Sequence, residues 1–211
     1  MASFLSLDLT TDIGKAAGWS AALTKQLPFA ISKALNDTAF DAKISLSGAT
    51  RQYFDNPTSF TQKGFGVEKS TKRDLEVIVG TEQRRARYLR TQITGGLRGI
   101  KPFETRIGHG RLVPGAGARL NASGNVSLAA IRKITAGLGK DYFIAQPGNP
   151  QRIGAGIYKR KGRTIKPILV MVDQASYSPR FPMLDVVSKV YERRYGMYFK
   201  TALERALATA R

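Results

Sequence analysis

The sequence has no cysteine and only one histidine among its 211 residues. Without cysteine, disulfide bonds and thiolate metal sites are excluded. The histidine, His109, lies between two glycines and has no second imidazole to share a metal ion or a catalytic relay. The residue types that usually hold a metal are therefore too few, and we expect neither a metal nor another cofactor.

Long apolar runs are also missing. No window approaches the roughly 18 uninterrupted apolar residues that a membrane-spanning helix needs. The first twelve residues lack the basic segment of a secretory signal. We therefore expect no membrane contact and synthesis in a cytoplasm.

Motifs of catalysis and nucleotide binding are incomplete. Pairs of glycines separated by one residue include those at 108–110, 115–117 and 154–156, and none of these extends to a dinucleotide fingerprint or a phosphate-binding loop. Asp37 and Asp41 stand one helical turn apart, a spacing that suits a metal or an acid–base pair. Lys33 lies four residues before Asp37, which favours a solvated helix face. The sequence predicts a protein that is not an enzyme.

Acidic residues are scarce: 15 Asp and Glu oppose 34 Lys and Arg, giving a net charge of +19. The imbalance is largest in residues 101–211, which hold 20 basic and 6 acidic groups, and no acid lies between Asp141 and Asp173. A field of this sign attracts polyanions such as nucleic acid or acidic protein surfaces. The charge alone does not select between them.

The densest positive run is QRIGAGIYKRKGRTIKP, residues 151–167, on an expected β-hairpin. Contact with nucleic acid, docking on an acidic protein ring and mere solubility all remain open readings of this charge. The candidate polyanion-binding or partner-binding residues are Lys159, Arg160, Lys161, Arg163, Arg84, Arg85, Arg98, Lys101, Arg106 and Arg111.

Periodicity predicts two long helices. Residues 27–54 place Leu27, Ile31, Leu35 and Leu46 on one stripe, with Pro28 expected in the first turn. A second long helix is expected over residues 182–209. Strands are expected at 65–70, 75–79, 142–145, 157–160 and 165–172, and a Gly-rich loop at 97–124.

These elements predict an α+β fold. We expect an antiparallel or mixed β-sheet, built from the segments near 65–79 and 142–172, with the long N-terminal and C-terminal helices packed across it. The hairpin and the Gly-rich loop 97–124 would protrude. Residues 1–26 are expected to form an arm or short helix, and residues 27–211 a single domain.

Several segments resemble minor tail and neck proteins of tailed bacteriophages. They are ALNDTAFDAK (Ala34–Lys43), YFDNPTSFTQKGF (Tyr53–Phe65), YLRTQITGGLR (Tyr88–Arg98), VPGAGARLNASGNVSLAAI (Val113–Ile131), GIYKR (Gly156–Arg160) and YSPRF (Tyr177–Phe181). In these segments the chain is similar to tail-completion proteins of the lambda Z type and to head–tail joining proteins. That family has no catalytic residues to carry over.

The resemblance implies a structural virion protein that forms a homo-oligomeric ring at the neck or upper tail, completes the tail and joins it to the head. Its implied neighbours are the connector, terminator, tail-tube and tape-measure proteins, with DNA in the channel as a further partner. It would reside in the virion, after assembly in the host cytoplasm. The alternative interpretation is a basic nucleic-acid-binding module, which the net charge favours.

Overall fold

The computed structural model describes residues 5–7, 21–107, 110–149 and 153–208. The chain divides into two compact units. Unit 1 combines Met1–Thr94 with Pro179–Arg211, and unit 2 is Gly95–Ser178. Each unit has its own cluster of buried apolar side chains. One domain was expected over residues 27–211, whereas in the structure residues 95–178 form a unit with its own core, and the first unit is made of the segments before and after it in the chain.

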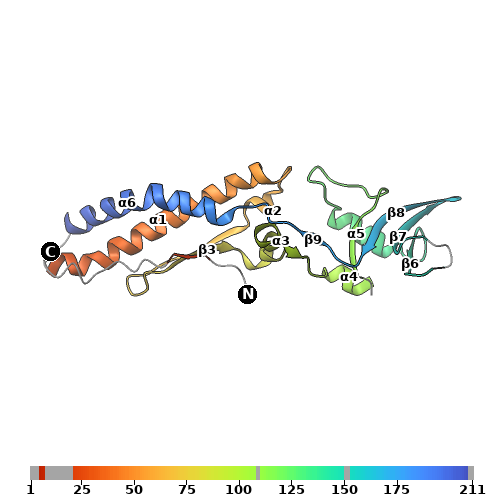
Figure 1. Ribbon diagram of the computed structural model, residues 1–211, viewed down its shortest axis with the longest axis horizontal. Coiled ribbons are helices and arrows are strands. Elements are labelled where there is room, and N and C mark those ends of the chain that lie inside the picture. The colour runs from red at the N-terminus through yellow and green to blue at the C-terminus, as the bar shows by residue number, and fades with distance from the viewer. Residues whose placement is uncertain (1–4, 8–20, 108–109, 150–152, 209–211) are drawn as a thin grey trace. The chain divides into compact units, whose positions relative to one another are not determined.

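Two long helices form the main part of unit 1. Helix α1 (Ala21–Tyr53) and helix α6 (Met183–Ala208) lie side by side in an antiparallel pair (Figure 1). Small and branched residues of α1, Ala34, Leu35 and Ala42 among them, are buried along its inner stripe. Such small side chains let a second helix approach closely. The end of α1 is tied to the start of α6 where the rings of Phe54 and Phe181 stack at 5.4 Å.

The position of Pro28 corrects one expectation. Proline was expected in the first turn, but α1 begins at Ala21 and Pro28 lies inside it. A proline in a helix interior removes one backbone hydrogen bond and costs about 3 kcal/mol. Because α1 is held along its length by α6, tertiary packing outweighs this local cost. Of the arm or short helix expected over residues 1–26, residues 8–20 lie outside the described residues, and residues 21–26 belong to α1.

A three-stranded antiparallel sheet covers the helices of unit 1. It contains β1 (Leu5–Leu7), β2 (Phe65–Glu68) and β3 (Val77–Thr81) in the order β1-β3-β2. Val77 and Val79 are buried in the same cluster as Leu35 of α1. Helices α2 (Ser59–Gln62) and α3 (Gln83–Thr94) complete the unit. Both strands expected between residues 65 and 79 are confirmed, with shifted ends.

Unit 2 is built on a four-stranded antiparallel sheet in the order β5-β8-β7-β6. Its strands are β5 (Arg111–Pro114), β6 (Tyr142–Ala145), β7 (Gly156–Lys161) and β8 (Thr164–Val172). A short pair, β4 (Gly96–Leu97) with β9 (Ser176–Tyr177), brings together the two ends of the unit. Helices α4 (Pro102–Ile107) and α5 (Leu128–Ala136) lie between strands in the chain. Ser127 caps α5, because its side-chain oxygen accepts a hydrogen bond from the Ala130 N–H.

The α+β class and the antiparallel pairing are confirmed, but two details are wrong. The segments near 65–79 and 142–172 belong to separate sheets in separate units, so no single sheet contains both. The expected Gly-rich loop 97–124 holds the short elements β4, α4 and β5. These elements are two to six residues long, too short to give a periodic pattern in the sequence.

Candidate polyanion-binding hairpin

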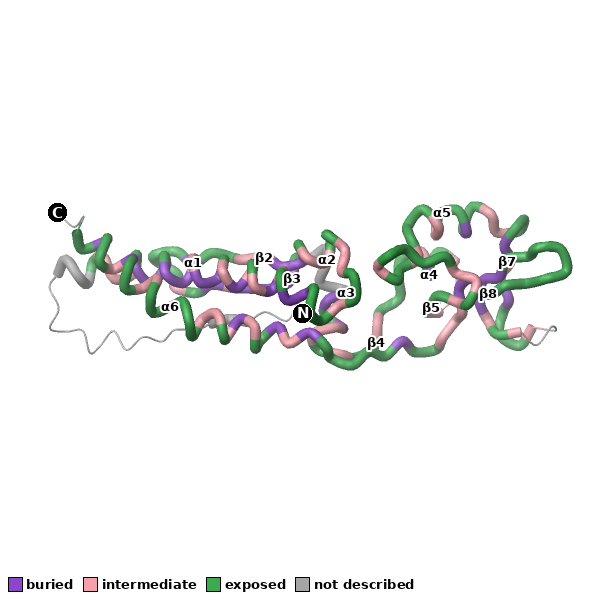
Figure 2. Tube along the Cα trace, turned by 90° about the horizontal axis from the view of Figure 1, so that it is seen from above, coloured by how far each residue is buried: buried purple, intermediate pink, exposed green. Residues whose placement is uncertain are grey.

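Strands β7 and β8 form the expected basic hairpin in the middle of the unit 2 sheet. Their ladder pairs Lys159 with Lys166, and then Arg160 with Ile165 and Lys161 with Thr164. The last two pairs extend past both neighbouring strands, because β6 begins opposite Lys159 and β5 ends opposite Leu169. The end of the hairpin is therefore a two-stranded ribbon, here called the basic ribbon (residues 159–166), and Figure 2 shows its tip as exposed.

A tight turn closes the basic ribbon. Gly162 has a φ of 60° and Arg163, the second central residue, stays in the ordinary negative range. A glycine with positive φ at the first central position defines a type II′ turn, whose twist matches that of the flanking strands. Gly162 therefore fixes a two-residue tip and leaves Arg163 at the outermost point of the ribbon.

The cations of the basic ribbon lie on both of its faces. Residues directly opposite in a ladder share a face, so Lys159, Lys161 and Lys166 lie on one face and Arg160 on the other. Each face has an aromatic base: Lys159 lies over the ring of Tyr142 at 5.5 Å and Arg160 over that of Phe143 at 5.4 Å. These contacts extend the side chains along apolar rings and leave their charges in solvent.

The outer cations of the ribbon have no internal partner among the described residues. Lys161, Arg163 and Lys166 are exposed, and the described part of the chain offers their side chains no carboxylate. Lys161 and Arg163 were predicted from the sequence, as were Lys159 and Arg160 nearer the base of the ribbon, whereas Lys166 was not singled out. Its position in the same positive run, opposite Lys159, is the signal that points to it.

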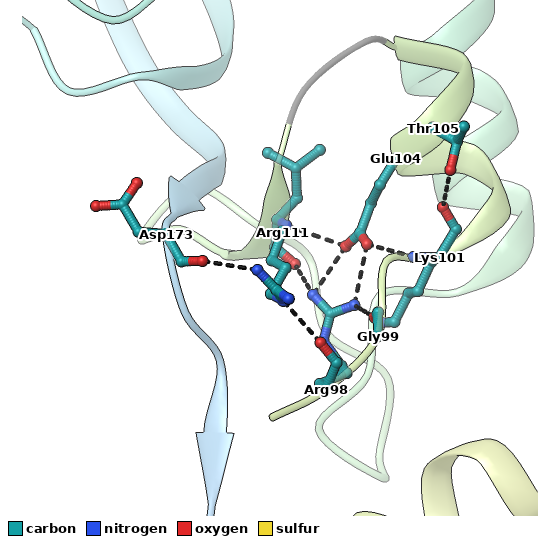
Figure 3. Close-up of polar contacts among 8 residues, drawn as sticks. Arg98, Gly99, Lys101, Glu104, Thr105, Arg111 and Asp173 are labelled. Carbon is teal, nitrogen blue, oxygen red and sulfur yellow. Dashed lines mark hydrogen bonds and ion pairs between the residues drawn. The ribbon is translucent and has the colours of Figure 1, made fainter. Parts of the chain in front are cut away.

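Arg98 and Glu104 form a buried ion pair elsewhere in unit 2 (Figure 3). The side chain of Glu104 is 0% exposed and that of Arg98 is 12% exposed. Two nitrogens of the guanidinium donate to the two carboxylate oxygens at 3.0 and 2.9 Å. The backbone N–H groups of Lys101 and Leu112 donate to the same carboxylate at 2.6 and 3.0 Å. All of these donors converge on one acid.

Most N–H groups of the Arg98 guanidinium are hydrogen-bonded within unit 2. Besides Glu104, the guanidinium donates to the carbonyl oxygens of Gly99 at 2.9 Å and Leu112 at 3.3 Å. Four of the five N–H groups of an arginine are thus occupied. Arg98 was a candidate for polyanion contact, but this geometry gives it a structural role.

Arg98 and Glu104 each shift the pKa of the other in the direction that favours the charged form. Burial by itself would raise the pKa of Glu104, but the hydrogen bonds from Arg98, Lys101 and Leu112, together with the Arg98 charge, hold it below its ordinary value. The hydrogen bond to Glu104 raises the pKa of Arg98 despite partial burial. Both groups are therefore charged throughout the ordinary pH range. In the sequence, Glu104 is a single acid within a segment rich in arginine. That pattern did not predict a buried ion pair with Arg98, which only the structure shows.

The other candidates of this segment divide between structural and solvent-facing roles. Arg111 donates to the carbonyl oxygens of Arg98 and Asp173, each at 2.7 Å, so it joins β5 to the chain on either side (Figure 3). Desolvation, and then the nearby Arg98 charge, lower the pKa of the Lys101 ammonium. Arg106 is exposed in the last turn of α4. None of these three belongs to the basic ribbon.

Arg84 and Arg85 lie on α3 in unit 1, and their side chains are outside the described residues. The same is true of His109. The ten predicted cations are therefore not one site: four lie on the basic ribbon, four are in the 98–111 segment of the same unit, and two are in the other unit.

Asp37 and Asp41, the spacing considered for a metal or acid–base pair, are engaged within unit 1. Asp37 pairs with Lys33 one turn earlier on α1. Asp41 accepts a hydrogen bond from the hydroxyl of Tyr198 at 2.6 Å and lies 3.8 Å from the guanidinium of Arg194. The bond to Asp41 raises the pKa of Tyr198. These contacts join α1 to α6.

Comparison with protein-family models, curated proteins and solved structures gives no match to this chain. The resemblance to phage tail-completion proteins therefore stays a prediction. Within the described ranges, no helix is long and apolar enough to cross a membrane. The described part of the chain also contains no group of three or more His, Cys, Asp or Glu residues placed to hold a metal ion.

Proposed function

We propose that this protein is a non-enzymatic structural subunit of a tailed-phage particle, working without a cofactor. In this proposal it forms a homo-oligomeric ring at the neck or upper tail, completes the tail and joins it to the head. Its neighbours would be connector, terminator, tail-tube and tape-measure proteins. The location follows from the resemblance of its sequence segments, and the assembly is supported by the surface of unit 1.

The observation that carries the proposal is the large apolar side chains on the outer faces of α1 and α6. Ile44 is 68% exposed, Leu184 55% and Met197 47%, and the rings of Phe29 and Phe40 are each 37% exposed. Single exposed apolar residues are ordinary, but several along one pair of helices mark a surface that other protein covers. A subunit that packs against copies of itself would bury them.

A substitution at Ile44 can test whether this apolar surface is an assembly interface. Ile44 borders a hollow of about 460 Å³ that it shares with Val190, Arg193 and Arg194. An apolar side chain next to arginines in a shallow hollow resembles the anchor positions of protein interfaces. Replacing it should weaken assembly and leave the core of unit 1 intact, because Ile44 itself is mostly in solvent.

The experiment compares the full chain with Ile44→Glu and with Gln52→Glu as its matched control. Both variants add one negative charge to an exposed position of α1, but only the first removes an apolar group. Sedimentation velocity and negative-stain microscopy should show rings for the parent chain and the control, and smaller species for Ile44→Glu. Immunogold labelling of phage particles should place the chain at the neck or upper tail.

Two results would overturn the proposal. One is a parent chain that stays monomeric at every concentration and is not found in purified particles. The other is an Ile44→Glu variant that assembles as readily as the control. The alternative, a basic nucleic-acid-binding module, is favoured by the basic ribbon, and the binding partner of that ribbon is a separate question.

A further inference from the structure

Unit 2 carries a charge imbalance that its own contacts do not relieve. Its residues include 14 Lys and Arg against 3 Asp and Glu. One of these acids, Glu104, is buried on Arg98 and offers nothing to the surface. The basic ribbon lies between the other two acids in the chain, Asp141 and Asp173, with no acid between them. In the fold Asp141 lies beside Arg160, whose backbone N–H donates to the Asp141 carbonyl oxygen at 3.0 Å, but among the described residues neither acid forms an ion pair with a ribbon cation.

The register of the ribbon makes this charge costly for the isolated hairpin. Lys159 and Lys166 lie directly opposite each other, and Lys161 follows on the same face. Like charges at directly opposed positions destabilise a strand pair. An anion bound along this face would convert the repulsion into attraction.

The shape of the ribbon selects among anions. We infer that the basic ribbon inserts into the major groove of B-form DNA, where its cations contact phosphates on both walls without reading the sequence. The major groove is about 12 Å wide and admits a two-stranded β-ribbon. The ribbon is two strands wide beyond Lys159, its faces both carry cations, and Arg163 extends from the tip.

An acidic protein surface fits these observations less well. A partner that packs against one face of the hairpin would cover Lys159, Lys161 and Lys166 and leave Arg160 unused on the other face. A groove has negative charge on two sides, which matches a two-faced distribution of cations. A-form RNA has a major groove too deep and narrow for side chains to read, so DNA is the expected duplex.

The inference does not depend on ring assembly, so either can fail alone. Its test uses the full chain with the triple substitution Lys161→Gln, Arg163→Gln and Lys166→Gln. The matched control is Arg73→Gln, Lys189→Gln and Lys200→Gln in unit 1. All six positions are exposed, and each triple removes three positive charges. Circular dichroism of both variants checks that each is folded before its binding is compared.

The probe is a labelled DNA duplex of about 25 base pairs of arbitrary sequence. The logarithm of affinity falls with the logarithm of salt by about 0.9 for each phosphate contacted. Loss of three contacts should therefore reduce the slope by about 2.7, so that from about 50 to about 200 mM salt the parent chain loses roughly 40-fold more affinity than the ribbon variant. The control should keep the parent slope.

Two competitors separate DNA from other polyanions. An RNA duplex of the same sequence and polyglutamate should both compete more weakly than unlabelled DNA at equal charge concentration. Equal slopes for the ribbon variant and the control would overturn the inference, because binding would then follow net charge alone. Competition by polyglutamate or RNA duplex as strong as that by DNA would also overturn it, because the groove would then play no part.

Discussion

Replacing Glu104 should destabilise unit 2 far more than an average substitution does. The carboxylate is 0% exposed and accepts hydrogen bonds from Arg98 and from the backbone N–H groups of Lys101 and Leu112. Glu104→Ala leaves the Arg98 guanidinium, only 12% exposed, without its counter-charge. Breaking a buried ion pair from one side costs about 3–5 kcal/mol, part of which is the stranded charge.

This loss is large relative to the stability of the unit. Unit 2 spans residues 95–178, and domains have roughly 0.05–0.15 kcal/mol of stability per residue, which gives roughly 4–13 kcal/mol. Glu104→Ala is therefore expected to unfold much of unit 2. Glu104→Gln is the more useful variant, since it keeps the shape but loses the charge, at about 1.5–3 kcal/mol for hydrogen bonds to a charged group.

A double-mutant cycle tests whether the pair is coupled. Arg98→Met alone strands the carboxylate, and Glu104→Gln alone strands the guanidinium. The double variant removes both charges and should be more stable than the sum of single effects predicts, by about 1–3 kcal/mol. It should still fall short of the parent chain, because the carbonyl oxygens of Gly99 and Leu112 lose a donor.

Native-state hydrogen exchange is the appropriate assay because the chain has two units. The Leu112 amide, which donates to Glu104, should lose protection in Glu104→Gln, while the Val79 amide in the sheet of unit 1 should keep it. The pKa of Glu104 lies below its ordinary value of 4.5, so its contribution is present above that pH and is lost as pH falls through the folded value. Unchanged protection of Leu112, or equal losses at both amides, would refute the reasoning.

Three further substitutions test the packing of the two units. Burial raises the pKa of Tyr195 to about 12. The parent chain should therefore lose stability relative to Tyr195→Phe as the pH rises above about 10, where the tyrosine ionises more readily in the unfolded chain. In an alkaline absorbance titration, the parent should show a tyrosine that ionises at higher pH than an ordinary one and that is missing from the variant. Asn36→Ala removes two hydrogen bonds to the Ser70 backbone, at 3.1 and 2.9 Å, and should lower the stability of unit 1 in urea by about 1–2 kcal/mol. Gly156→Ala would place a Cβ 2.3 Å from the Leu169 carbonyl oxygen, which cannot move without breaking the hydrogen bonds between β7 and β8. Hydrogen-exchange protection along these two strands should fall by about 1–3 kcal/mol. Unchanged protection in the variant would contradict this prediction.

The parts of the fold that the sequence predicted are those with a local pattern. The strand at 142–145 is found as predicted, and the hairpin around residues 161–164 has its tip at Gly162 and Arg163. The long helix expected over 182–209 is α6. Each of these follows from periodicity or turn chemistry within a few residues. Strand partners across the chain carry no such signal, so the expectation of one common sheet was wrong.

The candidate site shows the same division between local and long-range information. The charge of the ribbon was readable from residues 151–167, because it depends only on composition and on an expected turn. The internal contacts of Arg98 and Arg111 could not be predicted from the sequence. Arg98 pairs with Glu104, and Arg111 donates to the carbonyl oxygen of Asp173, and only folding brings these groups together. A sequence rich in cations does not reveal which of them are consumed internally.

The scarcity of acids in unit 2 therefore has two distinct consequences. Inside, Glu104 organises Arg98 and the N–H groups around it, and this single pair orders a segment that is otherwise rich in glycine. Outside, no carboxylate remains within the hairpin to oppose Lys159 and Lys166 across the ladder. Acids within the hairpin would have provided ion-pair partners for these cations. Asp41 in unit 1 is an example of such a partner, because it contacts both Tyr198 and Arg194. Because Lys161, Arg163 and Lys166 form no ion pair within the described residues, they keep their electrostatic attraction for an external polyanion, and binding of the proposed DNA partner would offset the like-charge repulsion of the ladder.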